Sequence, residues 1–269
     1  MSGFANTVEN TMTAVERLGD FDALEKEDKA QSTVEPPSEW PQNGTIEFKN
    51  YSMRYRDHLE LAVKNVNLTV SSGHQVGICG RTGSGKSSLV AALFRMAPSA
   101  SGCITIDGID IASMAVTTLR SRLTIIPQDP MLFSGSLRFN LDPSHLCSDD
   151  ELWAALKQVH LANFVGSLEF EVSEAGGNLS IGQLVVLDEA TANIDLETDR
   201  LIQTMLKESF HDVTRFIIAH RLNTIIDSDR ILVLDGGYVK EYDTPATLLE
   251  NNDGMFAQLV RQAHVQCSL

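Results

Sequence analysis

The sequence lacks any surplus of positive charge. Its 269 residues include 21 Lys or Arg but 36 Asp or Glu, which gives a formal net charge of −15. A charge of this sign and size opposes general attraction to DNA, RNA or anionic lipid, because the phosphates of these partners are also negative. A protein that binds nucleic acid over a broad surface is therefore excluded, whereas a small local site for an anion is not.

Long apolar runs and paired cysteines are also missing. The wholly apolar runs are short, such as Leu89–Phe94, and none approaches the ~20 residues of a membrane-spanning helix. The first residues, MSGFANTVEN, have neither the basic start nor the apolar block of a signal peptide. The cysteines show no CxxC spacing, which argues against a zinc site or a disulfide framework and fits a reducing compartment. They are Cys79, Cys103, Cys147 and Cys267.

The chain divides into a short leading part and a domain. Residues 4–18 place apolar side chains at steps of three and four, from Phe4 to Leu18, which predicts one amphipathic helix. Residues 19–43 are acidic and polar and end in PPSEWPQNG, a composition typical of a linker. We place the boundary near residue 40, which gives a leading part of 1–40 and a domain of 41–269.

Short apolar strands alternate with helical segments through the domain. Ser148 and Glu151 form a capping box at the start of one of these helices, and Gly236-Gly237 predicts a hairpin turn. The alternation predicts an α/β fold with a mostly parallel sheet, whose first and last strands are antiparallel. The expected strands are 45–49, 61–70, 75–79, 103–106, 123–126, 184–187, 215–219, 231–235 and 238–242, and the expected helices include 87–96 and 196–210.

The most specific motif is Gly80-Arg-Thr-Gly-Ser-Gly-Lys86-Ser87, which follows a predicted strand and opens a predicted helix. Glycines allow backbone N–H groups to turn inward around phosphate oxygens, and the helix N-terminus adds a positive dipole end. In this motif Lys86 reaches the β- and γ-phosphates, and Ser87 offers a hydroxyl to Mg²⁺.

A second motif, Leu184-Val-Val-Leu-Asp188-Glu189, is an apolar strand that ends in two acids. Such a strand downstream of a phosphate loop places one carboxylate near Mg²⁺ and a second near the attacking water.

With four further motifs in order, the chain resembles the nucleotide-binding domain of an ABC transporter. IIPQDP around Gln128 resembles the Q-loop, and Leu179-Ser-Ile-Gly-Gln183 resembles the LSGGQ signature. Residues 192–195 (ANID) resemble the D-loop, and IIAHR around His220 resembles the switch histidine. WPQNGTIEFKNYSMRYR and IPQDPMLFSGSLRFNLDP resemble subfamily C, the multidrug-resistance-associated type, and its second nucleotide-binding domain.

The resemblance implies a fold: a P-loop NTPase core of the ABC-ATPase type, with helices flanking a mostly parallel sheet. An N-terminal antiparallel β-subdomain and a helical subdomain accompany this core. The helix at 4–18 is similar to the end of a preceding membrane domain's last helix.

The resemblance also implies the site residues. Tyr55 would stack on adenine, Asp188 would hold Mg²⁺ through water, Glu189 would act as general base, and His220 would bond the γ-phosphate. Gln128 would contact Mg²⁺ and the attacking water. Ser180 and Gly182 would contact ATP bound to a second nucleotide-binding domain in a head-to-tail dimer. The loop residues implied to bind ATP are Gly80, Thr82, Gly83, Ser84, Gly85, Lys86, Ser87 and Ser88.

One spacing departs from the family pattern. Only Leu184–Leu187 separates Gln183 from Asp188, where the family has a long helix, so about 15 residues, or roughly 22 Å of helix, are missing. Four residues extend at most roughly 14 Å and are also needed as a strand. The helical subdomain is therefore expected to be truncated, and the signature and the two acids cannot both take their usual places.

Two functions stay open from the sequence. The first is an ATP-binding and ATP-hydrolysing domain that powers export through a membrane domain of an ABC transporter, with ATP and Mg²⁺ as ligands. The second is a degenerate chain that binds ATP without turnover. The resemblance implies that either would be associated with the cytoplasmic side of a membrane through a transporter's membrane domain, while the sequence itself holds no spanning segment.

Overall fold

The structure is a computed structural model that describes residues 12, 15, 17, 19, 34–125, 133–158, 162–172, 213–218 and 225–266. The predicted strand at 184–187 and the predicted helix at 196–210 lie outside these residues. Of the predicted leading helix at 4–18, the described residues 12, 15 and 17 are helical, as is residue 19 beyond it, and both Met12 and Val15 are exposed.

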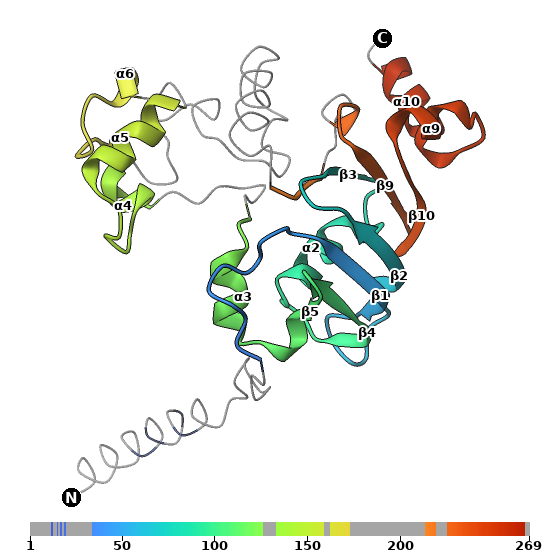
Figure 1. Cartoon of the computed structure of the whole chain (residues 1–269), viewed down its shortest axis with the longest axis horizontal. Coiled ribbons are helices and arrows are strands. Elements are labelled where there is room, and N and C mark those ends of the chain that lie inside the picture. The colour runs from blue at the N-terminus through green and yellow to red at the C-terminus, as the bar shows by residue number, and fades with distance from the viewer. Residues whose placement is uncertain are drawn as a thin grey trace, which may run out of the picture.

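The first sheet is antiparallel and has the strand order β2-β1-β4-β5 (Figure 1). Residues alternate between core and solvent along much of β2, as expected of a sheet with one buried face. Its strands are β1 (Ile46–Met53), β2 (Val63–Val70), β4 (Ser99–Ile106) and β5 (Ile109–Asp110). This sheet is the predicted N-terminal antiparallel β-subdomain.

The second sheet has the order β10-β9-β3-β8, and β3 runs parallel to both of its neighbours. Four of the five residues of β3 are buried, which is typical of a strand covered on both faces. Its strands are β3 (Gln75–Cys79), β8 (Arg215–Ile218), β9 (Arg230–Asp235) and β10 (Tyr238–Asp243). Only the last pairing, β9 with β10, is antiparallel among the described strands of this sheet.

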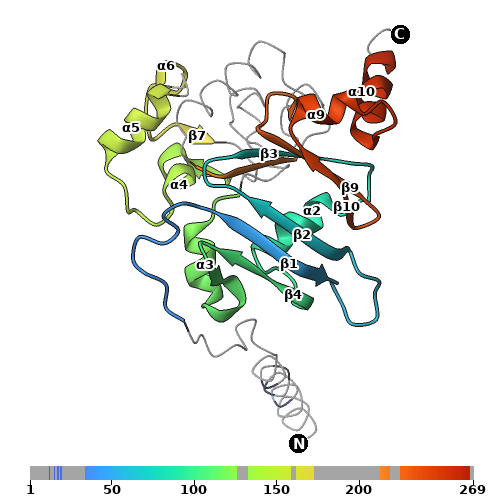
Figure 2. The ribbon, with the colours of Figure 1, turned by 45° about the vertical axis from the view of Figure 1, so that its right-hand side comes forward.

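Helix α2 (Lys86–Leu93) packs against both sheets, and Figure 2 shows the sheets in layers with α2 beside them. Its buried Leu89, Ala92 and Leu93 share one hydrophobic core with side chains of β1, β2, β3, β4 and β9. This shared core fixes the direction in which α2 leaves β3. The 3-10 helix η1 (Ile111–Ser113) and helix α3 (Val116–Arg122) follow β5.

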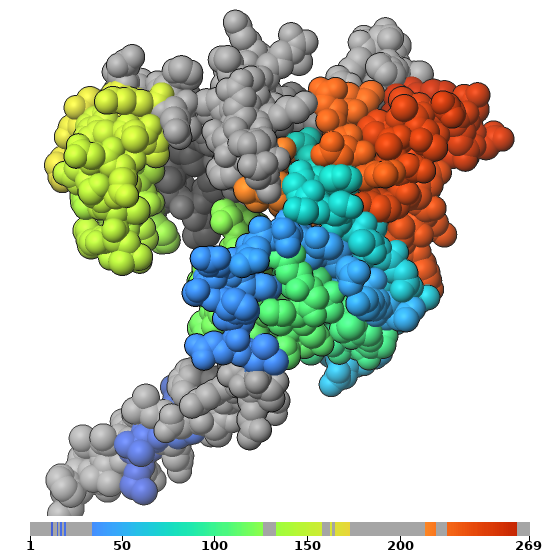
Figure 3. Space-filling model, in the orientation of Figure 1, coloured from blue at the N-terminus to red at the C-terminus, as the bar shows by residue number. Residues whose placement is uncertain are grey.

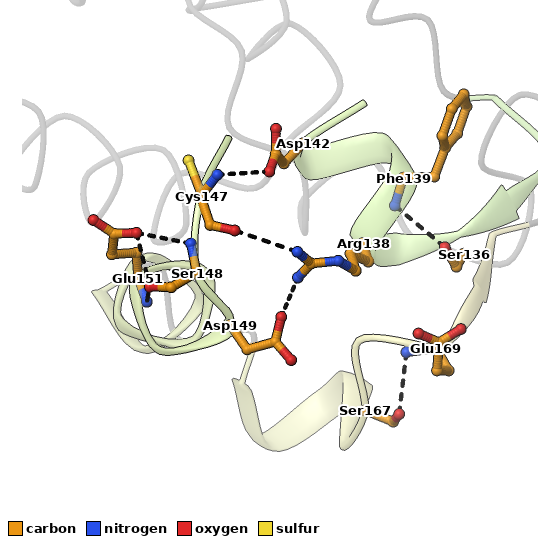
Figure 4. A network of polar contacts seen from close by, with 10 residues as sticks. All are labelled: Ser136, Arg138, Phe139, Asp142, Cys147, Ser148, Asp149, Glu151, Ser167 and Glu169. Carbon is orange, nitrogen blue, oxygen red and sulfur yellow. Dashed lines mark hydrogen bonds and ion pairs between the residues drawn. The ribbon is translucent and has the colours of Figure 1, made fainter. Parts of the chain in front are cut away.

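A separate lobe has its own small core, built around Leu137, Leu152 and Leu156. It contains β6 (Gly135–Ser136), α4 (Leu137–Leu141), α5 (Asp149–Gln158), α6 (Ala162–Val165) and β7 (Glu171–Val172). The Ser148 hydroxyl accepts a hydrogen bond from the Glu151 N–H, and the Glu151 carboxylate accepts one from the Ser148 N–H, so the predicted capping box is confirmed (Figure 4). Arg138 ties α4 to the same turn through Asp149 and the Cys147 carbonyl.

Two helices follow β10: α9 (Pro245–Glu250) and α10 (Met255–Gln266). The Glu241 carboxylate accepts hydrogen bonds from the backbone N–H groups of Met255 (2.7 Å) and Phe256 (2.9 Å). This carboxylate holds the first turn of α10 against β10, because N–H groups there have no partner within the helix. Among the described residues, no helix combines the length and the apolar character that crossing a membrane requires.

Most predicted elements within the described residues are confirmed, with shifted ends. Strand β4 begins at Ser99 rather than Cys103, because exposed residues without an apolar pattern pair with the end of β1. Helix α2 ends at Leu93 rather than Met96, because Arg95 takes a left-handed conformation with φ 50°. The strand expected at 123–126 is wrong for residues 123–125, which lie in no strand, while residue 126 is outside the described ranges.

The segment before β1 is clamped onto the antiparallel sheet. Trp40 is buried, and its indole Nε1 donates to the carbonyl of Ile106 at 3.0 Å. The Asp107 carboxylate accepts the N–H groups of Asn43, Gly44 and Thr45 at 2.9, 3.2 and 2.9 Å. Figure 3 shows this blue segment lying on the green surface of the β4–α3 region.

This clamp lowers the pKa of Asp107. Partial burial of the carboxylate raises its pKa, but backbone N–H groups of residues 42–45 outweigh burial and bring the pKa below the ordinary value of 3.8. A carboxylate with a depressed folded-state pKa stabilises the fold at neutral pH. That stabilisation is lost as the pH falls through the folded-state value, below 3.8.

We predict that Asp107→Asn lowers the free energy of unfolding by about 1–3 kcal/mol at pH 7, since charge-assisted hydrogen bonds are lost. The difference between parent and variant should shrink below about pH 4, where the parent carboxylate also becomes protonated. Urea unfolding at pH 7, 5, 4 and 3 measures both effects. Asp110→Asn is the control, because Asp110 accepts one backbone N–H, from Ala112. An equal loss in both variants would contradict the clamp.

Candidate functional site

The predicted phosphate loop lies between β3 and α2, at the carboxyl end of an inner strand of its sheet. Strand β3 ends at Cys79, the loop covers residues 80–85, and α2 begins at Lys86. In open α/β sheets ligands bind beyond the carboxyl ends of the parallel strands. The strand–loop–helix arrangement predicted from the sequence is therefore confirmed.

Two glycines of the loop are required by close backbone contacts. Gly80 has φ 147°, and a Cβ there would lie 2.2 Å from the carbonyl oxygen of Leu234. Gly85 has φ 103°, and a Cβ there would lie 2.8 Å from the carbonyl oxygen of Ala62. A Cβ on Gly83 would meet nothing within 4 Å, so the loop is packed on one side and open at Gly83.

The side chain of Lys86 turns back into the loop. It is only 7% exposed, and its Nζ donates to the carbonyl oxygens of Gly80 (3.0 Å) and Arg81 (3.2 Å). Both acceptors are neutral, so they satisfy hydrogen bonds without cancelling the positive charge. A buried cation without a paired anion is costly, and an anionic ligand at the loop would relieve that cost.

The start of α2 adds donors at the same place. Gly85 is the N-cap residue and no side chain caps the helix, so its first N–H groups are available to a ligand. The buried hydroxyl of Ser84 has no hydrogen-bond partner in the described structure, and Ser87 is exposed. A polyanion fits this set of donors.

Tyr55 lies beside this helix start. Its hydroxyl and that of Ser88 are 3.1 Å apart and hydrogen-bonded, although 33 residues separate them in sequence. The Tyr55 side chain is 49% exposed, so it is accessible to a flat ligand group. The structure thus brings together the predicted adenine residue and the predicted phosphate loop.

The other predicted site residues cannot be placed. Gln128, Ser180, Gly182, Asp188, Glu189 and His220 all lie outside the described residues. Strand β8, which ends two residues before His220, is described and pairs in parallel with β3, with Ile218 opposite Ile78. Strand β8 therefore ends at the same edge of the sheet as β3, where the phosphate loop begins.

The structure also tests whether Mg²⁺ fits here. Ser87 supplies a hydroxyl oxygen on the exposed side of the loop, and Mg²⁺ prefers oxygen ligands, usually few protein groups together with phosphates and water. Within the described ranges, no three His, Cys, Asp or Glu side chains gather as a metal site. The fit thus rests on Ser87 and on phosphate oxygens of the ligand.

Sequence reasoning missed the groups that pack behind the loop. These are backbone atoms of Ala62, Leu234 and Gly237, which no side-chain motif marks. The sequence signal that could have pointed to them was the pair Gly236-Gly237, which predicted a hairpin turn but no contact with the loop.

Cys79, directly before the loop, has a strongly altered acidity. Burial, together with the nearby Glu241 carboxylate, raises the pKa of its thiol to about 12, and the Lys86 ammonium opposes this rise. The thiol therefore stays protonated at physiological pH and takes no part as a nucleophile.

Comparison with known proteins identifies the domain. The sequence profile described as ABC transporter matches residues 63–193. The chain is 48% identical over 277 residues to ATP-binding cassette sub-family C member 2 of Rattus norvegicus, and 44% identical over 279 residues to multidrug resistance protein mrp-7 of Caenorhabditis elegans. Each alignment covers 96% of this chain and 18% of the relative, so the chain spans about a fifth of the length of these curated relatives.

A solved structure agrees. A bacterial Atm1-family ABC exporter with ATP bound superposes with a TM-score of 0.76 at 32% sequence identity, covering 88% of this chain and 45% of that chain. The alignment with the rat relative is longer than the part of this chain that it matches. The 277-residue alignment with the rat relative covers 96% of 269 residues, about 258, so it is about 19 positions longer than the matched part of this chain.

We predict that Cys79 resists alkylation in the folded chain while the exposed Cys147 reacts, because thiolates are the reactive form and a pKa near 12 leaves almost none at pH 8. Iodoacetamide labelling followed by tryptic mass spectrometry measures both sites. In urea the two cysteines should label at similar rates. Equal labelling in the folded chain would contradict the burial of Cys79.

Proposed function

This chain carries an ATP-binding domain of the ABC transporter family, of the subfamily C type, and we propose that it binds MgATP across Tyr55 and the loop 80–88 to power export. In this proposal the adenine stacks on Tyr55, and the phosphates lie over the open side of the loop at Gly83. The proposed ATP-binding residues are Tyr55, Gly80, Thr82, Gly83, Ser84, Gly85, Lys86, Ser87 and Ser88.

The observation that carries the proposal is the buried ammonium of Lys86, held by carbonyls of its own loop at the uncapped start of α2. Neutral carbonyl acceptors hold the side chain in place and leave its charge for a ligand. The position beyond β3 supports a nucleotide phosphate chain as that ligand, because helix N-termini and inward N–H groups suit phosphate oxygens.

For hydrolysis we propose roles for residues outside the described ranges. Glu189 acts as the general base toward the attacking water, His220 bonds the γ-phosphate, and Gln128 orients the water. Asp188, with Ser87 and Gln128, would hold Mg²⁺, and the ion would offset the negative charge that develops on the phosphates. These roles rest on the match of each residue to the family motif.

We further propose that the chain works as part of a larger assembly. Ser180 and Gly182 of the signature would contact ATP held by a second nucleotide-binding domain in a head-to-tail dimer. The chain's relatives are ABC transporters, so it would be associated with a membrane, on the cytoplasmic face, through a transporter's membrane domain. Residues 1–40 would be the connection to that domain, and 41–269 the nucleotide-binding domain.

A specific observation favours a second candidate, an ATP-binding chain without turnover. Only four residues lie between Gln183 and Asp188, and the alignment with the rat relative is about 19 positions longer than the matched part of this chain. A shortened link of this kind would displace the signature or the two acids, while Tyr55 and the loop 80–88 lie elsewhere in the sequence. Binding and turnover must therefore be measured separately.

We predict that MgATP raises the unfolding temperature of the parent chain and leaves that of Lys86→Ala unchanged. Ligand linkage gives about 2.7 kcal/mol of stabilisation at a concentration 100 times the dissociation constant. Differential scanning fluorimetry with and without nucleotide measures the shift. Because Lys86 is buried, each protein is compared with its own nucleotide-free form. A parent transition that MgATP does not move would refute ATP binding at this loop.

Stacking is tested at Tyr55. We predict that Tyr55→Ala weakens MgATP binding about 5- to 150-fold, since stacking of a base on an aromatic ring contributes ~1–3 kcal/mol. Tyr55→Phe keeps the ring, loses only the exposed hydrogen bond to Ser88, and should bind nearly as the parent does. Isothermal titration calorimetry measures the three constants. Equal weakening in both variants would assign the role to the hydroxyl and would contradict stacking.

Turnover separates the two candidate functions. If the chain hydrolyses ATP, steady phosphate release should fall at least 100-fold in Glu189→Gln, since a general base contributes about 10²–10⁴-fold, while MgATP binding is retained. The chain is assayed alone and with a second nucleotide-binding domain. If phosphate release by the parent is no greater than that by Lys86→Ala under both conditions, the chain binds ATP without turnover.

A further inference from the structure

We infer that the tip of the β9–β10 hairpin is a positioning element for the phosphate loop, in which Gly237 orients the N–H of Gly85 toward the nucleotide phosphates. The inference rests on the proposed ATP site and adds a residue to it that carries no side-chain chemistry. Gly237 lies more than 150 residues from the loop in sequence.

The first observation is a direct hydrogen bond between hairpin and loop. The backbone N–H of Gly237 donates to the carbonyl oxygen of Ser84 at 3.0 Å. The carbonyl oxygen of Gly237 in turn accepts the N–H of Lys64, in β2, at 2.8 Å. One residue thus links the phosphate loop to the antiparallel sheet.

The geometry of the peptide bond turns this contact into an orientation. In a trans peptide the C=O of one residue and the N–H of the next point in opposite directions. Because the carbonyl of Ser84 is held toward Gly237, the N–H of Gly85 points away from the hairpin. The packed side of the loop is formed by Ala62, Leu234 and Gly237, so this N–H faces the other, open side.

Close packing explains why the tip residue must be glycine. Gly237 is buried with φ 86°, and a Cβ on it would lie 2.8 Å from the carbonyl oxygen of Ala62 and 3.3 Å from its carbon. The same Ala62 oxygen would lie 2.8 Å from a Cβ on Gly85. Hairpin, loop and the start of β2 therefore meet at one carbonyl group, and a methyl group at Gly237 must move at least one of them.

The neighbouring glycine offers a matched control. Gly236 is exposed with φ 56°, and a Cβ on it would meet nothing within 4 Å. In a two-residue hairpin turn with positive φ at both positions, alanine is strained at either position. Only alanine at Gly237 also disturbs the contact with the loop.

We test the inference with Gly237→Ala and Gly236→Ala in ¹⁵N-labelled full-length chain. We expect the dissociation constant for MgATP, from calorimetry, to rise about tenfold in Gly237→Ala, as for loss of one hydrogen bond to a charged group. In Gly236→Ala it should stay within about twofold of the parent. The amide proton resonance of Gly85 should move downfield on nucleotide addition in the parent and in Gly236→Ala, and much less in Gly237→Ala.

The outcomes separate this inference from the proposed function. A parent chain whose Gly85 resonance and heat of binding show no response to MgATP refutes the ATP site itself. If the parent binds MgATP and Gly237→Ala matches it in both affinity and Gly85 shift, the role of the hairpin is overturned while the ATP site stands. A lower unfolding temperature in Gly237→Ala with an unchanged Gly85 shift also overturns it, because the residue would then be structural only.

A second measurement applies if Gly237→Ala does not fold. In the unmodified chain the Gly237 amide should exchange with deuterium more slowly when MgATP is bound, because phosphate contacts to the loop hold the Ser84 carbonyl in place. The Gly236 amide serves as the internal reference, since nothing in the inference connects it to the loop. Nucleotide-independent exchange of Gly237 in a chain that binds MgATP would overturn the positioning role.

Discussion

The close approach of backbone to backbone around the loop 80–85 is the constraint on which the site depends. Carbonyl oxygens of Leu234 and Ala62 lie where Cβ atoms of Gly80 and Gly85 would be. These contacts hold Gly80 and Gly85 at positive φ, a path that most residues avoid. That path places the carbonyls of Gly80 and Arg81 around the ammonium of Lys86 and leaves the opposite side of the loop open to a ligand.

The rest of the domain keeps those backbones in place. Helix α2 shares a hydrophobic core with both sheets through Leu89, Ala92 and Leu93, so it cannot shift away from β3 without exposing apolar surface. The antiparallel sheet carries Ala62 and Tyr55 to the loop. The Asp107 clamp holds the segment that follows Trp40 against the turn between β4 and β5.

Much of the site could be predicted from the sequence because its chemistry is local. The glycine spacing, Lys86 and the apolar strand before them are contiguous, and local patterns of this kind specify a strand, a turn and a helix start. The capping box at Ser148 and the hairpin at Gly236-Gly237 are contiguous signals too. Prediction failed at 123–125 and at the ends of two elements: pairing with β1 decides where β4 begins, and the left-handed Arg95 decides where α2 ends.

The sequence by itself determined the family, the α/β class, the phosphate loop and the shortened link between Gln183 and Asp188. It also identified Tyr55, although only by resemblance. Tertiary structure alone decided that the Tyr55 hydroxyl meets Ser88, and that the Ala62, Leu234 and Gly237 backbones close behind the loop. The physical reason is that backbone carbonyls and N–H groups are the same in every residue. Where they meet depends on chain topology and packing, which no local pattern of side chains encodes.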